Sequence, residues 1–367
     1  MKILPISIAQ TRFLNPIILL KALLWYFFRS FQINNNHKYR SLFLGDDNTE
    51  IIKKLYIPKE IKIISKPDKD SIILISKFNL YLLIKNIKNF KSIRIVDKNF
   101  FLTSEASTRL RLFYYDFLSP EEKQEYKNLS IKNFNSLQIP LSDQVIGLLG
   151  TGPSYNEAKD IFLKNKFNII SCNSSIYDDE LWERDCKILC FADPVFHFGN
   201  SNEANRFKTA VINRFRLKKF HIVCPISAVP ILINIWNLDE RYIIGIDSLS
   251  KNNDNRALTA NNTSNVLTEF MLPTASLITK EIYLGGFDGR DSSEKNFWKY
   301  SDQTHQTLDE HRENHPSFFN DRNISKYYNK HLTILKNQIV NLEKSNYKII
   351  NVTKSYIPVL SQRYRNE

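Results

Sequence analysis

Glycine is scarce in this sequence. Only 9 of its 367 residues are glycine, yet three of them stand in one short stretch at residues 145–154, "VIGLLGTGPS". The stretch begins as an apolar strand and leads into the start of a helix. Because glycine has no side chain, it lets the backbone come close to a ligand or to another segment. This turn is therefore the first place to look for a binding site.

Cysteine is also sparse, and its spacing disfavours a zinc ribbon. The sequence has four cysteines but no CxxC pair followed by a second such pair. All four lie in apolar runs that read as strands, so we expect buried thiols in a reducing compartment. They are Cys172, Cys186, Cys190 and Cys224.

The longest apolar run is too short and too interrupted to span a membrane. Residues 13–28, "FLNPIILLKALLWYFF", contain Lys21 and end at Arg29, and no signal-peptide cleavage site follows. We expect an interfacial helix over 13–29 with its aromatic residues at the headgroup level, which places the protein in the cytoplasm, peripheral to the inner membrane. A helix buried in the N-terminal domain is the alternative.

Positive charge is concentrated in the first part of the chain. Residues 1–142 hold 23 Lys and Arg against 12 Asp and Glu, whereas residues 143–367 hold 28 against 26. An excess confined to one part indicates a polyanionic surface as a partner. Anionic lipid and nucleic acid both fit the charge, but no nucleic-acid-binding motif is present, so an anionic membrane surface is the partner we expect.

The length and the apolar pattern predict two α/β domains. Residues 1–142 form a smaller domain, with strands expected at 41–45, 61–65, 71–76 and 92–97 and helices between them. A helix begins at Ser119, where an N-cap serine, a proline and two acidic residues follow one another. The polar stretch 128–142 separates this domain from the next.

The second domain, residues 143–367, alternates strands with helices, which predicts a mostly parallel, Rossmann-like sheet covered on both faces. The expected strands are 145–149, 168–172, 187–192, 220–224, 242–246, 281–285 and 348–352. The expected helices are 155–165, 204–217, 227–237, 264–279 and 324–344.

Ligands of such sheets bind beyond the carboxyl ends of the strands, where the GTGPS turn lies. This turn lacks the Lys-Ser/Thr of a P-loop and the spacing of a dinucleotide fingerprint. Its glycines and the helix start behind it nevertheless suit an anion, because backbone N–H groups and the helix dipole face the same point. A tight strand-to-helix turn explains the pattern equally well.

Four segments follow one another along the chain: "VIGLLGTGPSYNEA", "NIISCNSSIYDDELW", "CKILCFADPVFHFG" and "NNTSNVLTEFMLPTASLITKEIYLGGFD". This set resembles the bacterial sialyltransferases of glycosyltransferase family 42, over about residues 143–355. The resemblance implies a GT-A-like domain and an inverting, metal-independent enzyme. Such an enzyme moves sialic acid, or a related nonulosonic acid such as Kdo or pseudaminic acid, from its CMP form onto a surface glycan of lipooligosaccharide or capsule.

The resemblance also assigns the donor site. The turn would frame the cytidine and phosphate, Asn173 would bind the nucleotide, Thr263 and Ser264 would face the sugar carboxylate and phosphate, and Asp288 would end the strand beneath. The turn residues are Gly150, Thr151, Gly152, Pro153 and Ser154.

This sequence departs from the family at three points. Asp193 stands where the family has asparagine, and Asn265 follows Thr263-Ser264 where the family has glycine. The family's tyrosines that donate to the leaving phosphate have no clear match. We expect Arg290, Tyr300 or Arg256 to stabilise the departing CMP instead, through a cationic or phenolic group.

A histidine near its ordinary pKa suits the general base of such a transfer. His315 is our first choice because it precedes the last long helix and is followed by Pro316. His331 lies inside that helix, where a structural role is the competing interpretation, and His311 is the third choice. The polar segment 289–322 is expected to be a lid that carries the acceptor site.

Two other functions stay open. A nucleotide-binding protein or a diphosphokinase-like enzyme would use the GTGPS turn without sugar transfer. Nucleic-acid binding through the basic N-terminal part is the other. An assembly of several copies of the chain is compatible with every one of these functions.

Overall fold

The computed structural model describes residues 41–45, 62–68, 71–75, 93–95, 115, 118–141, 144–184, 186–194, 196–248, 258–261, 263, 265–290 and 324–365. The helix expected at 13–29 lies outside these residues, as does most of the lid expected at 289–322. Within the described part, no helix is both long and apolar enough to cross a membrane.

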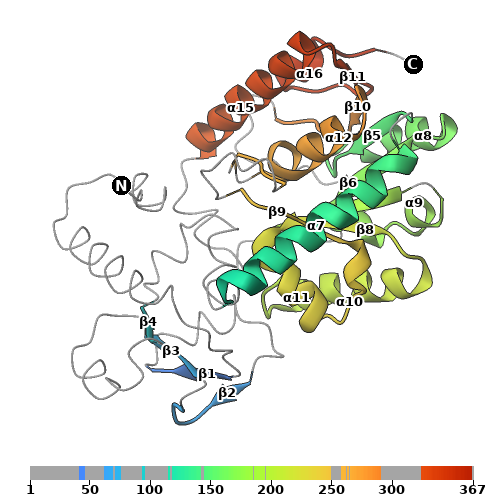
Figure 1. Ribbon diagram of the computed structural model, residues 1–367. Helices are drawn as coiled ribbons and strands as arrows, with labels where there is room; N and C mark the ends of the chain where they lie inside the picture. Colours follow the sequence, from blue (N-terminus) through green and yellow to red (C-terminus); the bar gives the residue numbers. More distant parts are fainter. Residues whose placement is uncertain are drawn as a thin grey trace.

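The larger unit is built on a seven-stranded sheet in which every pair of neighbours is parallel (Figure 1). The strand order is β11-β10-β5-β6-β7-β8-β9. The Rossmann-like parallel sheet expected from the alternating pattern is confirmed, and each strand lies within two residues of its expected position. The strands are β5 (Ile146–Leu149), β6 (Asn168–Cys172), β7 (Cys186–Cys190), β8 (His221–Pro225), β9 (Ile243–Ile246), β10 (Glu281–Gly285) and β11 (Lys348–Asn351).

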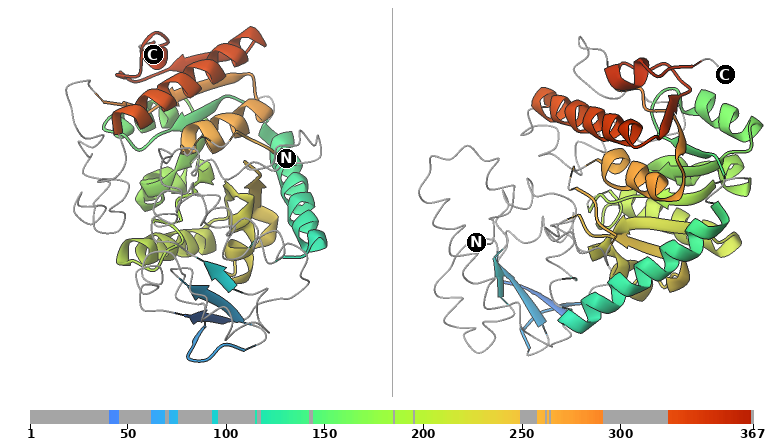
Figure 2. Two further views of the ribbon diagram at one scale, coloured as in Figure 1. Left: turned by 90° about the vertical axis from the view of Figure 1, so that its left-hand side faces the viewer. Right: turned by 45° about the horizontal axis from the view of Figure 1, so that its top comes forward.

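Helices cover both faces of this sheet, so its central strands are buried at almost every position. One face packs against α8 (Tyr155–Lys164), α9 (Asp179–Glu183), α10 (Asn202–Leu217) and α11 (Val229–Asn234). The other face packs against α7 (Pro120–Leu141), α12 (Leu272–Ile278), α15 (Ile324–Lys344) and the short α16 (Pro358–Ser361). The two further views show these two helical layers (Figure 2).

The chain reverses its direction of progress across the sheet at β5. After β5 it proceeds through β6, β7, β8 and β9 in one direction, and then returns to place β10 on the other side of β5. The helix after β5, α8, therefore lies on one face of the sheet, and α15, the next described helix after β10, lies on the other. In open parallel sheets, such a switch point is where a crevice forms.

The four strands expected near the N-terminus are present in a second sheet of order β2-β1-β3-β4, with all pairs parallel. They are β1 (Ser41–Leu44), β2 (Ile63–Ile64), β3 (Ser71–Ile75) and β4 (Ile93–Ile95). The helices expected between them lie outside the described residues, so the N-terminal α/β domain stays a prediction.

Helix α7 begins at the expected residue. The hydroxyl of Ser119 accepts the N–H of Glu122 at 3.1 Å, and the Glu122 carboxylate accepts the N–H of Ser119 at 3.0 Å. This reciprocal capping box fixes the first turn. The polar stretch 128–142, which we expected to separate two domains, is almost entirely the second half of this helix, and it packs on β9.

Side chains of α7 bind the backbone of β9, which is an edge strand. The Asn133 amide donates to the carbonyls of Glu240 (2.6 Å) and Ile243 (2.8 Å), and the Ser130 hydroxyl accepts the buried N–H of Gly245 at 2.9 Å. The helix thereby supplies the partners that a further strand would give, which protects the edge from pairing with another chain.

We predict that Ser130→Ala lowers the free energy of unfolding by about 1–3 kcal/mol, because it leaves the Gly245 N–H buried without its partner. Urea denaturation measures the change. Ser136→Ala is the matched control, since Ser136 lies on the same helix, is exposed and bonds only to the carbonyl of Lys132. Equal effects of the two substitutions would contradict the edge-protecting role.

Candidate functional site

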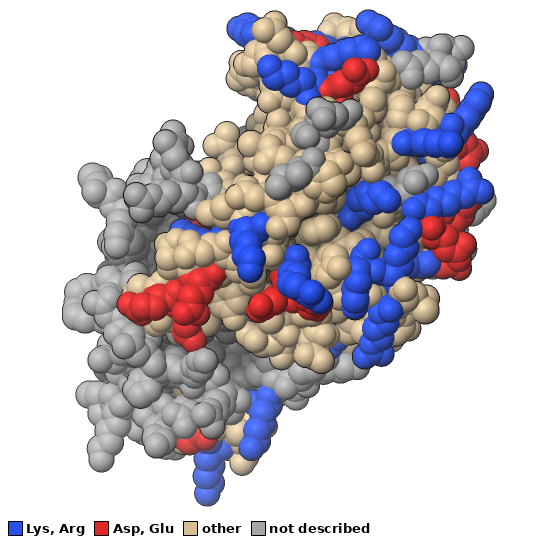
Figure 3. All heavy atoms as spheres, turned by 45° about the vertical axis from the view of Figure 1, so that its right-hand side comes forward, with Lys and Arg blue, Asp and Glu red and all other residues tan. Residues whose placement is uncertain are grey.

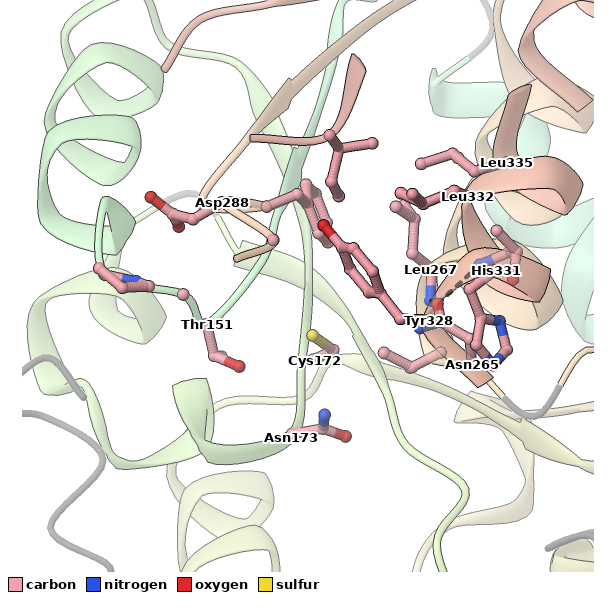
Figure 4. A pocket seen from close by; sticks show the side chains of 18 residues that line it. Thr151, Cys172, Asn173, Asn265, Leu267, Asp288, Tyr328, His331, Leu332 and Leu335 are labelled. Atoms are coloured by element: carbon pink, nitrogen blue, oxygen red, sulfur yellow. Dashed lines mark hydrogen bonds between the residues drawn. The ribbon is translucent and has the colours of Figure 1, made fainter. Parts of the chain in front are cut away.

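A cavity of about 210 Å³ lies at the carboxyl ends of β5, β6 and β10, at the switch point of the sheet (Figure 4). Three strand-end loops form one wall, and helices supply the other. The loops contribute Thr151, Gly152, Pro153, Cys172, Asn173, Gly286, Phe287, Asp288 and Gly289. The remaining lining residues are Asn265, Val266, Leu267, Thr268, Tyr328, His331, Leu332, Leu335 and Ile357.

The glycines of the GTGPS turn allow the turn after β10 to approach closely. A Cβ on Gly150 would lie 2.5 Å from the carbonyl oxygen of Gly286, and a Cβ on Gly152 would overlap the Asp288 carboxylate. The two turns are joined by backbone hydrogen bonds of 2.9 Å, from Gly150 N to Gly285 O and from Gly152 N to Gly286 O. Contact between the turns therefore accounts for both glycines without a ligand.

Asp288 occupies the N-terminus of α8. Its two carboxylate oxygens lie 3.1 and 3.2 Å from the backbone nitrogen of Ser154, which donates to them, while the Ser154 side chain makes no capping bond. Burial raises the pKa of Asp288 above its ordinary value, and the hydrogen bond from Ser154 partly opposes this. The Asp288 carboxylate thus accepts the backbone N–H that we expected to bind the donor phosphate.

The turn after β10 is itself fixed from the far side by the segment after β11. The Thr353 hydroxyl accepts the N–H of Gly286 (3.1 Å), the Ser355 hydroxyl donates to the carbonyl of Phe287 (2.7 Å), and the N–H of Tyr356 donates to the carbonyl of Asp288 (2.7 Å). These bonds hold Asp288 in place before any ligand arrives.

Asn173 stands in an uncommon backbone conformation. Its φ is +49°, and it is the first residue of the 3₁₀ turn η3 (Asn173–Tyr177) directly after β6. The other described non-glycine residues with positive φ follow helices, where this conformation commonly ends a helix: Lys166, Asn237 and Asn346. Such a conformation at a strand end brings the Asn173 side chain to the cavity wall and is typical of functional positions.

A buried ionic network ties this turn to α8. The Asp178 carboxylate accepts the hydroxyl of Tyr155 (2.8 Å) and lies 3.1 Å from the ammonium of Lys159, and it also caps α9 at the N–H of Leu181. Burial and the adjacent carboxylate raise the pKa of Tyr155, so its hydroxyl stays a donor. The network thus fixes the loops after β5 and β6 relative to each other.

The helical wall begins with a π-helical turn, η6 (Leu267–Met271). The Asn265 side chain caps its start by accepting the N–H groups of Leu267 (3.0 Å) and Thr268 (3.4 Å). From α15, the Gln338 amide donates to the carbonyl of Thr268 at 2.7 Å. π-Turns are rare and often mark functional sites, where they displace a side chain from its helical position.

Thr263 lies one layer behind the cavity. Its hydroxyl is 2.8 Å from that of Thr268, and its N–H donates to the buried carboxylate of Glu269 at 3.0 Å. The segment that the resemblance places against the donor is therefore anchored to η6 through two residues that the sequence had not singled out.

Helix α15 closes the cavity with Tyr328, His331, Leu332 and Leu335, which lie on one helical face (Figure 4). The guanidinium of Arg290 lies 5.1 Å from the centre of the Tyr328 ring, within cation–π range, and the N–H of Arg290 donates to the Tyr328 hydroxyl at 3.3 Å. His331 is buried among these groups and lines the cavity.

The structure brings six of the expected site residues to the cavity: Thr151, Gly152, Pro153, Asn173, Asp288 and His331. Gly150, Ser154 and Thr263 lie directly behind its wall, and Arg290 reaches it through Tyr328. Five more lie outside the described residues: Ser264, Tyr300, His311, His315 and Arg256.

Asp193 does not line this cavity. Its carboxylate accepts the N–H of Phe196 at 3.0 Å, and its own N–H donates to His197 Nδ1 at 2.9 Å. His197 itself packs on the rings of Phe191 and Phe207. These two bonds join residues within the loop itself.

Cys172 lines the cavity with a buried thiol. Its thiol is buried, as are those of the other three cysteines, and none forms a disulfide, which confirms the expected buried thiols. Burial raises the pKa of Cys172 to about 12. The thiol is therefore protonated at neutral pH and serves as a small apolar wall.

The fold and the cavity define a class: a Rossmann-like α/β protein with a cavity at the switch point of its parallel sheet. No protein family, curated protein or solved structure matches the chain.

Gly152→Ala is expected to lower the free energy of unfolding by about 1–3 kcal/mol, because the added methyl group meets the Asp288 carboxylate and the Gly286 carbonyl, whose positions are fixed. The control is Thr151→Ala in the same turn, with an expected change of about 0.5 kcal/mol or less. Urea denaturation that found Gly152→Ala as stable as Thr151→Ala would refute the close contact of the two turns.

The raised pKa of Asp288 predicts a pH-dependent stability difference from Asp288→Asn. Because the folded protein binds the Asp288 proton more tightly than the unfolded chain, this group stabilises the fold below its ordinary pKa. That contribution is lost as the pH rises through the raised value. The unfolding free energy of the wild type, minus that of Asp288→Asn, should therefore fall with rising pH. A difference that grows with pH would show that the Ser154 hydrogen bond dominates.

Proposed function

We propose that this chain is an inverting, metal-independent glycosyltransferase that moves sialic acid, or a related nonulosonic acid, from its CMP form onto a bacterial surface glycan. One observation carries the proposal. Segments of the resemblance that are far apart in the sequence converge on a single cavity: the GTGPS turn, Asn173, residues 265–268 and residues 286–289. Only the "CFADPVFHFG" segment stays away from it.

The reaction joins an acceptor oxygen to the anomeric carbon of the sugar. As that bond forms, the bond from the anomeric carbon to the phosphate oxygen breaks, CMP leaves, and the proton of the acceptor hydroxyl passes to a base. His331 is the histidine that the cavity wall presents, so its burial there favours it as the base. His315, in the expected lid, is the other candidate.

We assign the donor phosphate to the neighbourhood of Arg290, because of the charges around the cavity. The described lining contains the Asp288 carboxyl and the His331 imidazole but neither lysine nor arginine. An anionic donor would be held away from Asp288, toward the guanidinium that stacks on Tyr328. Asn173 and Thr151 then offer neutral donors and acceptors to the hydroxyl groups or the base of the nucleotide.

The cavity is smaller than the roughly 300–1,000 Å³ of common ligand pockets. It therefore holds one part of a CMP-sugar, with the apolar side chains of Leu332 and Leu335 against a flat face of the ligand. We assign the acceptor and the remainder of the donor to the expected lid, which includes Tyr300.

We expect the full chain to release CMP from a CMP-activated nonulosonic acid when a glycan acceptor is present. His331→Ala should lower kcat by about 10²- to 10⁴-fold, with a smaller change in the KM of the donor, because it removes the base rather than a binding group. Lys330→Ala, an exposed neighbour on α15, is the control and should keep full activity.

Three other results are informative. Thermal stabilisation by CMP-sugars without release of CMP would favour a nucleotide-binding protein instead of a transferase. Full activity of His331→Ala together with loss in His315→Ala would move the base to the lid. The proposed function would be refuted if no CMP-sugar stabilised the protein and none released CMP.

A further inference from the structure

Basic side chains gather at the amino edge of the seven-stranded sheet, which is the end opposite the cavity (Figure 3). They precede or begin β6, β7 and β8, and these three strands are neighbours, so their starting loops lie side by side. We name this group the basic edge. It comprises Lys164, Lys166, Arg184, Lys187, Arg216, Lys218 and Lys219.

The loops of the basic edge are held together by direct contacts. The ammonium group of Lys218 donates to the backbone carbonyls of Glu183 (2.9 Å) and Arg184 (2.8 Å), which joins the loop before β8 to the loop before β7. These bonds involve neutral carbonyls, so the positive charge of Lys218 is not cancelled.

Acidic side chains offset only a small part of this charge. Glu180 lies 3.0 Å from the ammonium of Lys159 and 3.5 Å from the guanidinium of Arg184, and is already shared between them. Asp179 pairs with Arg214, outside the basic edge. Glu183 also lies at this corner, and Asp239, just before β9, interacts with Lys219 but is paired with Arg241. The seven cations of the basic edge therefore outnumber the described carboxylates around them.

An exposed leucine stands in the middle of this charge. Leu217 is 85% exposed, and its neighbours Arg216, Lys218 and Lys219 are exposed too. A single exposed apolar residue is ordinary by itself. Here it ends α10 and is surrounded by cations, which is the pattern of segments that insert an apolar side chain between charged headgroups.

We propose that the basic edge docks on an anionic lipid bilayer, with Leu217 entering the boundary of the acyl chains and the cations contacting lipid phosphates. The chemistry distinguishes lipid from nucleic acid. The aliphatic side chain of Leu217 is stabilised among acyl chains, but it offers a nucleic acid no aromatic ring for base stacking. This surface is independent of the proposed transferase activity and of residues 13–29.

Flotation of the full chain with vesicles tests the proposal. The wild type should bind vesicles of mixed phosphatidylglycerol and phosphatidylcholine, should bind pure phosphatidylcholine far more weakly, and should be released by salt. A basic residue near such a surface strengthens binding about fivefold. The triple variant R216E/K218E/K219E should therefore bind at least about a hundredfold more weakly.

Two variants make the result specific. The control K132E/K330E/K336E changes the net charge equally at exposed positions on α7 and α15, and should retain most of the binding. Leu217→Ser keeps every charge and should weaken binding several-fold without changing its dependence on salt. Melting curves confirm that each variant is folded.

Equal vesicle binding by the two triple variants would overturn the proposal, because the attraction would then follow net charge and not this edge. Absence of vesicle binding by the wild type would overturn it as well. So would salt-sensitive binding of RNA that is lost in R216E/K218E/K219E when vesicle binding is unchanged.

Discussion

The structure depends on the close approach of two turns, those that leave the adjacent strands β5 and β10. Gly150 and Gly152 on one side and Gly286 on the other let the backbones touch, and Asp288 then reaches across to the first turn of α8. With a side chain at any of these glycines, the two loops would have to separate. The cavity beside them would then lose the contact between the two turns that closes it on this side.

The remaining parts of the site follow from this contact. The strand order brings the loop of β6 beside that of β5, and the Tyr155–Asp178–Lys159 network fixes their relative position. Helix α15 lies across the opening and is bound to η6 through Gln338. The result is a cavity with a polar loop wall, an apolar helical wall and one buried imidazole. Under the proposed function, this cavity holds a fragment of the nucleotide sugar and Arg290 supplies the positive charge.

The sequence predicted the sheet well because burial on both faces makes each strand a short apolar run, and such runs are visible without any partner. It predicted the helix start at Ser119 because a capping box is local. It gave the wrong role to residues 128–142, since only the position of β9 shows that Asn133 and Ser130 face a strand edge.

The local sequence could not show why the GTGPS turn needs its glycines either. The group beside Gly152 is Asp288, which is far away in the sequence. Glu269 and Gln338 were missed for the same reason. The α15 wall had a usable signal, since Tyr328, His331 and Leu335 are spaced to share one helical face. The basic edge leaves no signal in the overall charge, because residues 143–367 hold nearly equal numbers of basic and acidic residues. It forms only when the starts of neighbouring strands come together.

The central claim is that the cavity at the switch point of the sheet binds the CMP-activated donor. A crystal structure of the full chain with CMP or an unreactive CMP-sugar tests it most directly. The account predicts ligand density in this cavity, in contact with Asn173, with the phosphate toward Arg290 and the reacting centre within reach of His331. Density elsewhere, with this cavity empty, would contradict it.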